Sequence, residues 1–419
     1  MQITLAHGVL ADGESLNQKK NKMNVYIKIY PAKNGDCFLI SFGETTAEKK
    51  HLLIDCAYVD TFQNYLKDDL IQIGKSGGTL EKLILTHIDA DHIQGAIRLF
   101  KDNNAEKFIV IKEVWHNTYR HLCVQKEGEI DIKQERILQQ IIRRGYPQSE
   151  SKQGDKGISA EQGTTVGALL LQGKYSWNSD FNNQAVCIEQ RPEIKLDADT
   201  NIYLLSPDKQ KLEKLKDLWT DELKRYGANF NSGNSQLYDD AFEMLVSWEQ
   251  KKAKVAPKPI SGAKETLEEL LKTPFDEDNT ATNGSSIAFI LQVQNKRILF
   301  LADAHPGLIV QSLNEYQNEG TIIFDLIKVS HHGSFGNISR ELLNKIDSER
   351  YLISTNGQKH SHPDKETIAH IITRKADFHR KLYFNYITAN STYFDREDWK
   401  EKCNYSIHYL DQQPYTLTI

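Results

Sequence analysis

Four side chains that can bind a metal ion lie within six consecutive positions of one short segment. The segment, Lys82–Gly95, reads K-L-I-L-T-H-I-D-A-D-H-I-Q-G, and the four side chains are His87, Asp89, Asp91 and His92. The apolar run Leu83–Leu85 predicts a buried strand before them, and apolar residues at helical spacing across Ile93–Phe100 predict a helix after them. The four side chains are therefore expected on a strand-to-helix loop, where ligand-binding groups gather in α/β proteins.

The alternation of these residues favours two adjacent metal ions over one. In an extended segment His87, Asp89 and Asp91 share one side, and His92 turns to the other. The alternative interpretation is that Asp89 or Asp91 simply caps the helix that follows. A cap would account for one acid and for neither histidine, so metal binding is the preferred interpretation.

The elements around the motif recur later in the chain. The strand that ends in Asp55 has a counterpart in Arg297–Leu301, which is followed by Asp303. The segment Leu83–His87 has a counterpart in Leu326–His331. Each half thus delivers an aspartate and then a histidine from strand ends, and this repetition predicts two sheets related by pseudo-symmetry.

The motif T-H-x-D-x-D-H resembles the H-x-H-x-D-H motif of the metallo-β-lactamase-fold hydrolases, with Asp89 in place of the second histidine. This variant is similar to the soluble lactamase-like domain of the ComEC/Rec2 family. Three further stretches carry the resemblance: the opening G-D-C-F-L-I…L-L-I-D-C, the V-S-H-H-G-S around His331, and the S-T-N-G-Q-K-H-S-H-P that ends in His362-Pro363. The likeness covers most of Val25–Tyr386 apart from an inserted helical block.

The resemblance implies an α/β fold, the metallo-β-lactamase-type four-layer αβ/βα sandwich, with a helical insertion. The expected organisation is an N-terminal extension (1–23) and a single domain (24–419), divided into a first half (24–205), an insertion (206–278) and a second half (279–419). Alternating apolar residues also predict strands at Val166–Gln172 and Gln184–Gln190. The sequence leaves open whether the insertion is a solvated cap, a lid or a surface for a protein partner.

The resemblance also implies the remaining metal ligands. Asp303 matches the acid that bridges both ions in the family, and either His331 or His332 matches the final histidine, with the internal repeat favouring His331. One more ligand is expected after the run Phe108–Trp115, where His116 is the first candidate and His121 the second; His116 is equally compatible with a polar loop residue. The predicted ligands are His87, Asp89, Asp91, His92, His116, Asp303 and His331.

Further roles follow for residues beside the predicted ions. Asp91 is expected to orient or deprotonate the water that the ions share, and His362 to protonate the leaving oxygen. His332, Ser334 and His360 are expected to face the substrate, although Ser334 is equally compatible with a helix cap. The predicted cofactors are two divalent ions, zinc or manganese. A carboxylate at Asp89 is a harder ligand than imidazole and favours manganese.

The predicted activity is that of a metal-dependent hydrolase, specifically a phosphodiesterase or nuclease that uses a hydroxide bridged between two ions. One alternative is hydrolysis of a small ester, lactone or cyclic nucleotide. Another is a partner-binding module that holds structural metal. The net charge of −5 over 419 residues excludes a global basic field. A DNA or RNA substrate would therefore need a local patch, for which the sequence offers Arg98, Lys112, Arg120, Arg143, Arg144 and Lys328.

The N-terminal residues and the hydropathy of the chain bear on its location. No apolar run reaches the ~20 residues that span a bilayer, and Met1–Lys22 lacks the apolar core of a signal peptide. These features predict a cytoplasmic protein without membrane contact. The five cysteines are scattered and form no C-x-x-C pair, which argues against a disulfide framework.

Overall fold

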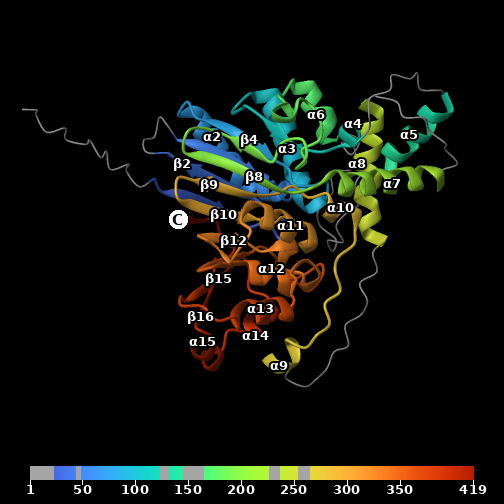
Figure 1. Ribbon diagram of the computed structural model, residues 1–419. Coiled ribbons are helices and arrows are strands. Elements are labelled where there is room, and N and C mark those ends of the chain that lie inside the picture. Colours follow the sequence, from blue (N-terminus) through green and yellow to red (C-terminus); the bar gives the residue numbers. More distant parts are fainter. Residues whose placement is uncertain (1–22, 44–48, 123–131, 145–164, 226–235, 253–264) are drawn as a thin grey trace, which may run out of the picture.

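The computed structural model describes residues 23–43, 49–122, 132–144, 165–225, 236–252 and 265–419 (Figure 1). Apart from Met23, the predicted N-terminal extension lies outside the described residues. Within the described ranges, no helix combines the length and the apolar character needed to cross a membrane.

The first sheet has seven strands and is built mainly from the start of the chain. Its order is β17-β1-β2-β3-β4-β5, with β6 also paired to β4. The β3–β4, β4–β5 and β4–β6 pairs are parallel, whereas β1, β2, β3 and β17 pair antiparallel. The strands are β1 (Val25–Ile29), β2 (Phe38–Phe42), β3 (Lys50–Ile54), β4 (Thr79–Ile84), β5 (Val110–Ile111), β6 (Val114–Trp115) and β17 (Tyr415–Thr418).

The second sheet has eight strands in the order β16-β15-β14-β12-β10-β9-β8-β7. The run from β10 to β16 is parallel, and β7, β8 and β9 complete the sheet antiparallel. A separate pair joins β11 to β13. The strands are β7 (Glu193–Lys195), β8 (Thr200–Ser206), β9 (Ala288–Val293), β10 (Lys296–Phe300), β11 (Ile322–Phe324), β12 (Leu326–Lys328), β13 (Ile346–Ser348), β14 (Arg350–Ile353), β15 (Arg380–Phe384) and β16 (Tyr405–Tyr409).

The helices cover the outer faces of the two sheets, with α2, α3 and α6 on the first and α11, α12 and α13 on the second (Figure 1). Those in the first part of the chain are α1 (Val59–Thr61), the π-helical turn η1 (Phe62–Leu66), α2 (Lys67–Lys75), α3 (Ala90–Glu106), α4 (Tyr119–Leu122), α5 (Ile132–Arg144), α6 (Val166–Gly173) and η2 (Ser179–Phe181). Those after β8 are α7 (Lys209–Arg225), α8 (Gln236–Lys252), α9 (Leu267–Leu270), α10 (Ala281–Gly284), α11 (Pro306–Tyr316), η3 (Ser330–Gly333), η4 (Phe335–Asn337), α12 (Arg340–Lys345), α13 (Lys365–Ile372), α14 (Ala389–Tyr393) and α15 (Glu397–Cys403).

Three apolar layers result, as a period-two strand requires when both of its faces are buried. In β3, Leu52 and Ile54 point into the layer between the sheets, where they join residues of the second sheet such as Phe289. Leu53 points instead to the layer beneath the helices of the first sheet. A third layer lies beneath the helices of the second sheet. The predicted four-layer αβ/βα sandwich is therefore confirmed.

The insertion contributes to two of these layers. Trp219 of α7 and Phe242 of α8 are buried and meet edge to face at 5.6 Å, within the layer that includes α3. Leu267 and Leu270 of α9 pack instead beneath the helices of the second sheet. The inner faces of these helices are thus part of the core, and a lid or partner role for the insertion remains a prediction.

Two strand predictions are wrong. Val166–Gln172 forms α6, and Gln184–Gln190 forms no strand. The helix is favoured because the Thr165 hydroxyl accepts a hydrogen bond from the backbone N–H of Ala168, a regular N-cap. The Glu243 carboxylate accepts two further backbone N–H groups, those of Val166 and Gly167, each at 3.0 Å.

Candidate metal centre

Parallel strands of both sheets end at one edge of the sandwich, where side chains from distant segments meet. Asp55 follows β3 and His87 lies just beyond β4 in the first sheet. Asp303 lies just beyond β10 and His331 beyond β12 in the second sheet. The two halves of the chain therefore bring their predicted acids and histidines to the same place.

One carboxylate oxygen, Oδ2 of Asp303, lies at the middle of this group. It is 3.6 Å from Nε2 of His87 and from Nε2 of His331. It is 3.9 Å from Nε2 of His92 and from Nε2 of His332. These distances are too long for good hydrogen bonds. They are close to the roughly 3.4 Å that separates two ligand atoms on one tetrahedral ion with ~2.1 Å bonds.

In three of these rings the second nitrogen, Nδ1, lies within hydrogen-bond distance of a protein oxygen atom. His92 Nδ1 is 2.7 Å from Asp55 Oδ2, His331 Nδ1 is 2.8 Å from Asn337 Oδ1, and His332 Nδ1 is 2.8 Å from the backbone oxygen of Ser354. Such contacts fix the ring so that Nε2 faces inward, as in metal-binding histidines. The Nε2 atoms of His92 and His332 are buried and have no hydrogen-bond partner within the described structure.

The motif loop adds two carboxylates to the group. Asp89 occupies the N-cap position of α3 but makes no side-chain capping bond, and its Oδ2 lies 3.1 Å from His87 Nε2. Asp91 Oδ2 accepts a hydrogen bond from Asn34 Nδ2 at 2.6 Å and lies 4.0 Å from His332 Nε2. The alternative of a simple helix cap therefore does not describe Asp89. We call the whole set the cluster: His87, Asp89, Asp91, His92, Asp303, His331 and His332.

Overlapping triads of the cluster have their ligand atoms within 4.8 Å of one another. One triad is His87, His92 and Asp303, and another is Asp91, His92 and His332. A third group joins His92 to Asp36 and Asp55. The donor set of imidazoles and carboxylates, with inward nitrogens left unsatisfied, suits zinc or manganese.

The backbone at His331 and His332 is unusual and explains how both neighbouring rings reach Asp303. Their φ angles are 42° and 55°, in the left-handed region that costs a non-glycine residue of order 1–3 kcal/mol. The turn is held by a hydrogen bond of 2.8 Å from the His331 N–H to the carbonyl oxygen of Ala302. The Ser334 N–H adds another, 2.8 Å to the carbonyl oxygen of His331.

The charges of the cluster shift two pKa values in opposite directions. Burial acts to lower the pKa of His92, but the carboxylates of Asp55 and Asp303 override it and raise the pKa to about 10. Burial acts to raise the pKa of Asp303, but His331, His332 and the other two imidazoles hold it well below the usual range. Without an ion, a proton on His92 therefore supplies positive charge where a metal ion would do so.

His116 and His121 lie in different surroundings. His116 Nε2 is 3.3 Å from Glu243 Oε1, and its ring stacks on Trp177 at 6.2 Å. His121 Nδ1 accepts a hydrogen bond of 3.1 Å from the Thr118 N–H. Neither histidine belongs to any group of potential ligands found among the described residues. A ligand role for either one remains a prediction without geometric support.

Two histidines predicted to act on or to face the substrate, His362 and His360, lie beside the cluster. The His362 ring lies 5.5 Å from the His331 ring, and its Nδ1 is 3.4 Å from Asp364 Oδ1. His360 follows at 5.7 Å from His362. Burial lowers the pKa of His360 to about 4, helped by the nearby Lys359, so this ring is neutral near pH 7.

In this region one predicted surface cation, Lys328, is buried, and two residues that the sequence did not single out, Asp278 and Lys359, lie next to the cluster. Buried Lys328 forms an ion pair with Asp36 and so offers no charge to a nucleic acid, contrary to its predicted place in a basic patch. Asp278, at the end of the insertion, lies 3.7 Å from His331 Nδ1. Lys359 Nζ lies 3.5 Å from Asp91 Oδ2. Lys359 lies in the segment S-T-N-G-Q-K-H-S-H-P, whose histidines were predicted to act on or to face the substrate. That segment was the one sequence feature that could have pointed to Lys359.

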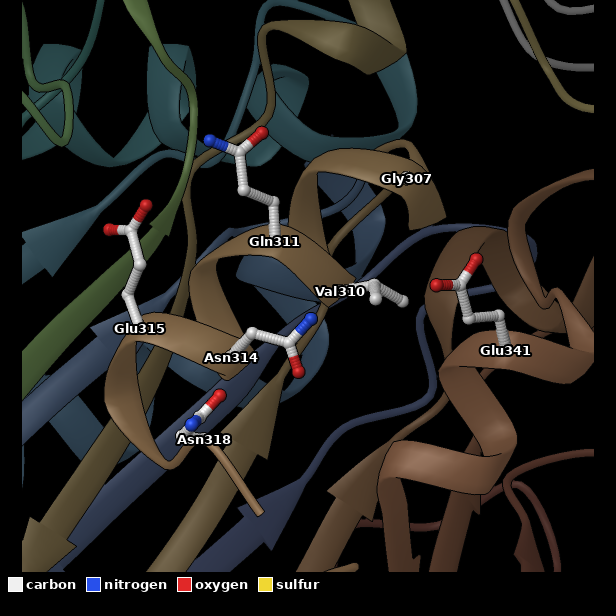
Figure 2. Close-up of a pocket in the computed structure, with 7 residues that line it drawn as sticks. All are labelled: Gly307, Val310, Gln311, Asn314, Glu315, Asn318 and Glu341. Atoms are coloured by element: carbon white, nitrogen blue, oxygen red, sulfur yellow. The ribbon is translucent and has the colours of Figure 1, made fainter. Parts of the chain in front are cut away.

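A separate hollow of about 470 Å³ lies between α11 and α12 (Figure 2). The side chains of Gln311, Asn314 and Glu315 project from α11, and Glu341 projects from α12 (Figure 2). None of the residues that line it is cationic, and none belongs to the cluster. It therefore does not suit an anionic substrate.

Part of the chain matches a known protein family. The sequence model of the metallo-β-lactamase superfamily matches residues 30–161, which include the motif loop but not Asp303 or His331. No curated protein matches the chain. Among solved structures, the crystal structure of a long form RNase Z from yeast aligns with 87% of this chain and 36% of that chain, at 10% identity and a TM-score of 0.33. This chain thus spans about a third of that enzyme, and so distant a likeness says nothing of activity. The fold is the metallo-β-lactamase fold.

Proposed function

We propose that the protein is a metal-dependent phosphodiesterase, with a DNA or RNA strand as its substrate. The observation that carries the proposal is the convergence of four imidazole Nε2 atoms on Asp303 Oδ2 at 3.6–3.9 Å. A buried group of histidines and acids is costly to fold unless a cation compensates it. A bound divalent ion would supply that compensation.

We further propose two ions per chain. The cluster offers seven imidazole or carboxylate groups, which exceeds the four ligands of one tetrahedral ion. Asp303 would be shared, with His87 and Asp89 on one side and Asp91, His92 and His332 on the other. His331 would join the first side, because its Nε2 and that of His87 are equally close to Asp303 Oδ2.

When bound, such ions activate water and polarise the phosphoryl oxygen. The protein side chains then have separate tasks. Burial acts to raise the pKa of Asp91, but Lys359 and two histidines lower it, so the carboxylate is ionised and can orient a water molecule. His362, whose Nδ1 lies 3.4 Å from Asp364 Oδ1, would deliver a proton to the leaving oxygen.

The experiment is hydrolysis by metal-stripped protein reloaded with manganese or with zinc. The substrates are bis(p-nitrophenyl) phosphate, single-stranded DNA and RNA, and p-nitrophenyl acetate represents the ester alternative. We expect diester cleavage, with manganese at least as effective as zinc. The matched variant Asp89→His should move the preference toward zinc, because imidazole is the softer ligand. Cleavage of p-nitrophenyl acetate alone would favour the ester alternative. If the metal-reloaded wild-type protein cleaved none of these substrates, the binding module would be favoured.

A further inference from the structure

The cluster is closed to solvent on most sides. The side chains of His87 and His92 are 0% exposed, and that of Asp303 is 3% exposed. The His331 side chain is 22% exposed, that of His362 is 13% exposed, and that of Lys359 is 41% exposed. A substrate therefore reaches the cluster past these last three residues.

Lys359 is the most open of the three and carries a full positive charge. Its ammonium lies 3.5 Å from Asp91 Oδ2, at the upper limit of a hydrogen bond. That oxygen already accepts a shorter bond, 2.6 Å, from Asn34 Nδ2. An ammonium has three donors, and this single long contact uses at most one of them. Lys359 therefore has donors to offer a ligand.

The turn that carries Lys359 is anchored at both ends. On its N-terminal side, the Thr355 N–H donates to Asn385 Oδ1 at 2.8 Å and the Gly357 N–H donates to Thr355 Oγ1 at 3.1 Å. On its C-terminal side, Asn390 Nδ2 donates to the carbonyl oxygens of Ser361 and Pro363, at 3.0 and 2.8 Å. The backbone is thus fixed while the lysine side chain extends over the cluster.

Two other lysines near the exposed side of the cluster form ion pairs with aspartates outside it. Lys328 is buried against Asp36. Lys33, which adjoins Asn34, pairs with Asp60 at 2.5 Å. Among these three lysines, Lys359 alone combines solvent access with a position next to Asp91.

We propose that Lys359 binds a non-bridging oxygen of the substrate phosphate and so places the phosphorus atom beside Asp91. This inference rests on the proposed function, because it assigns the anionic group of the same substrate. The ligand chemistry is a phosphate mono- or diester. Lys359 forms and breaks no covalent bond and acts by charge and hydrogen bonding.

The test measures binding of inorganic phosphate to the manganese-loaded 419-residue protein by titration calorimetry. We expect Lys359→Gln to weaken phosphate binding about 10-fold or more, the scale of one hydrogen bond to a charged group. Lys359→Arg should keep most of the affinity. The control is Lys365→Gln, a partly exposed lysine six positions on that pairs with Glu265 at 2.6 Å. Metal content should be unchanged in all three variants.

Three results would overturn the inference. The first is that Lys359→Gln binds phosphate as tightly as wild type, and the second is that wild type itself does not bind phosphate. The third is that Lys359→Gln loses metal, which would make Lys359 a support for Asp91. Failure of the proposed function gives a different result, since phosphate binding would still depend on Lys359 while no diester was cleaved. Diester turnover with phosphate affinity insensitive to Lys359→Gln would defeat this inference alone.

Discussion

His92 Nδ1 lies 2.7 Å from Oδ2 of Asp55, so the acid of the first half stands behind a histidine of the cluster. Asp55 also accepts hydrogen bonds from the backbone N–H and the hydroxyl of Thr86, at 2.8 and 2.7 Å. Its counterpart in the repeat, Asp303, faces the inward nitrogens instead. The two halves of the chain therefore repeat the same residue type at strand ends but use it differently.

The first prediction concerns this support of His92. Asp55→Asn should lower metal affinity about 10- to 100-fold, the usual effect of losing a carboxylate behind a metal-bound histidine. The fold should persist, because asparagine tolerates the left-handed φ of 51° at this position. Competition with a chromophoric chelator measures the affinity. Asp69→Asn, which alters an acid bonded to Tyr30 and Lys28, should leave it unchanged.

The second prediction concerns the pH dependence of stability in metal-free protein. The His92 pKa is raised to about 10 from about 6.5 in the unfolded chain, so its contribution is complete below pH ~6.5 and is lost as pH rises toward 10. The Asp303 pKa is depressed, so its contribution is present above pH ~4 and is lost as pH falls further. Taken together, these two contributions, from His92 and Asp303, favour the fold most between about pH 4 and 6.5.

Thermal melting of chelator-treated protein between pH 6.5 and 9.5 tests the predicted loss of the His92 contribution as pH rises. The melting temperature of wild type should fall with pH, and that of His92→Gln should fall less steeply. Equal slopes for the two proteins would contradict the assignment of the raised pKa to His92.

Much of the cluster was predictable because its residues follow apolar strands at a regular spacing. The run Leu83–Leu85 located the motif loop, and its repeat at Leu326–His331 located the second histidine segment. The repeat could not show that His331 and His332 both approach Asp303, because this depends on two successive left-handed residues. Sequence reasoning treats such a conformation as rare.

Contacts between distant parts of the chain account for what the sequence could not show, including the wrongly predicted strand at Val166–Gln172. The run at Val166–Gln172 has strand-like composition, but Glu243, 77 residues after Val166, caps it as a helix. His116 follows a strand end, as a ligand would, yet it meets the same carboxylate. Lys359 reaches Asp91 across 268 positions. Local periodicity carries no information on such pairings.

The third prediction separates this structural site from the cluster. Glu243 is fully buried and accepts from Val166 N–H, Gly167 N–H and the His116 side chain. Glu243→Ala should destabilise the protein by about 3 kcal/mol, since buried donors lose their acceptor. Metal content should not change. Denaturant unfolding and elemental analysis of one preparation test both statements, and loss of metal without loss of stability would place His116 in the metal site.

The fourth prediction concerns proton donation by His362. His362→Ala should keep the fold and the metal while diester turnover falls about 10²-fold or more, the scale of a positioned acid. The matched control is His379→Ala, an exposed histidine bonded to Asn404 and Ser406. Normal turnover by His362→Ala, with a substrate whose leaving group needs protonation, would exclude His362 as the acid.

The most direct measurement for the central proposal is the metal content of wild type and of Asp303→Ala, each saturated with manganese or zinc and desalted. Asp303 Oδ2 is the atom on which four imidazoles converge. We predict about two ions per wild-type chain, as the ligand inventory requires, and fewer than one in Asp303→Ala, with a lower melting temperature. Wild type that retains one ion or none, or Asp303→Ala that retains the full complement, would contradict the proposal.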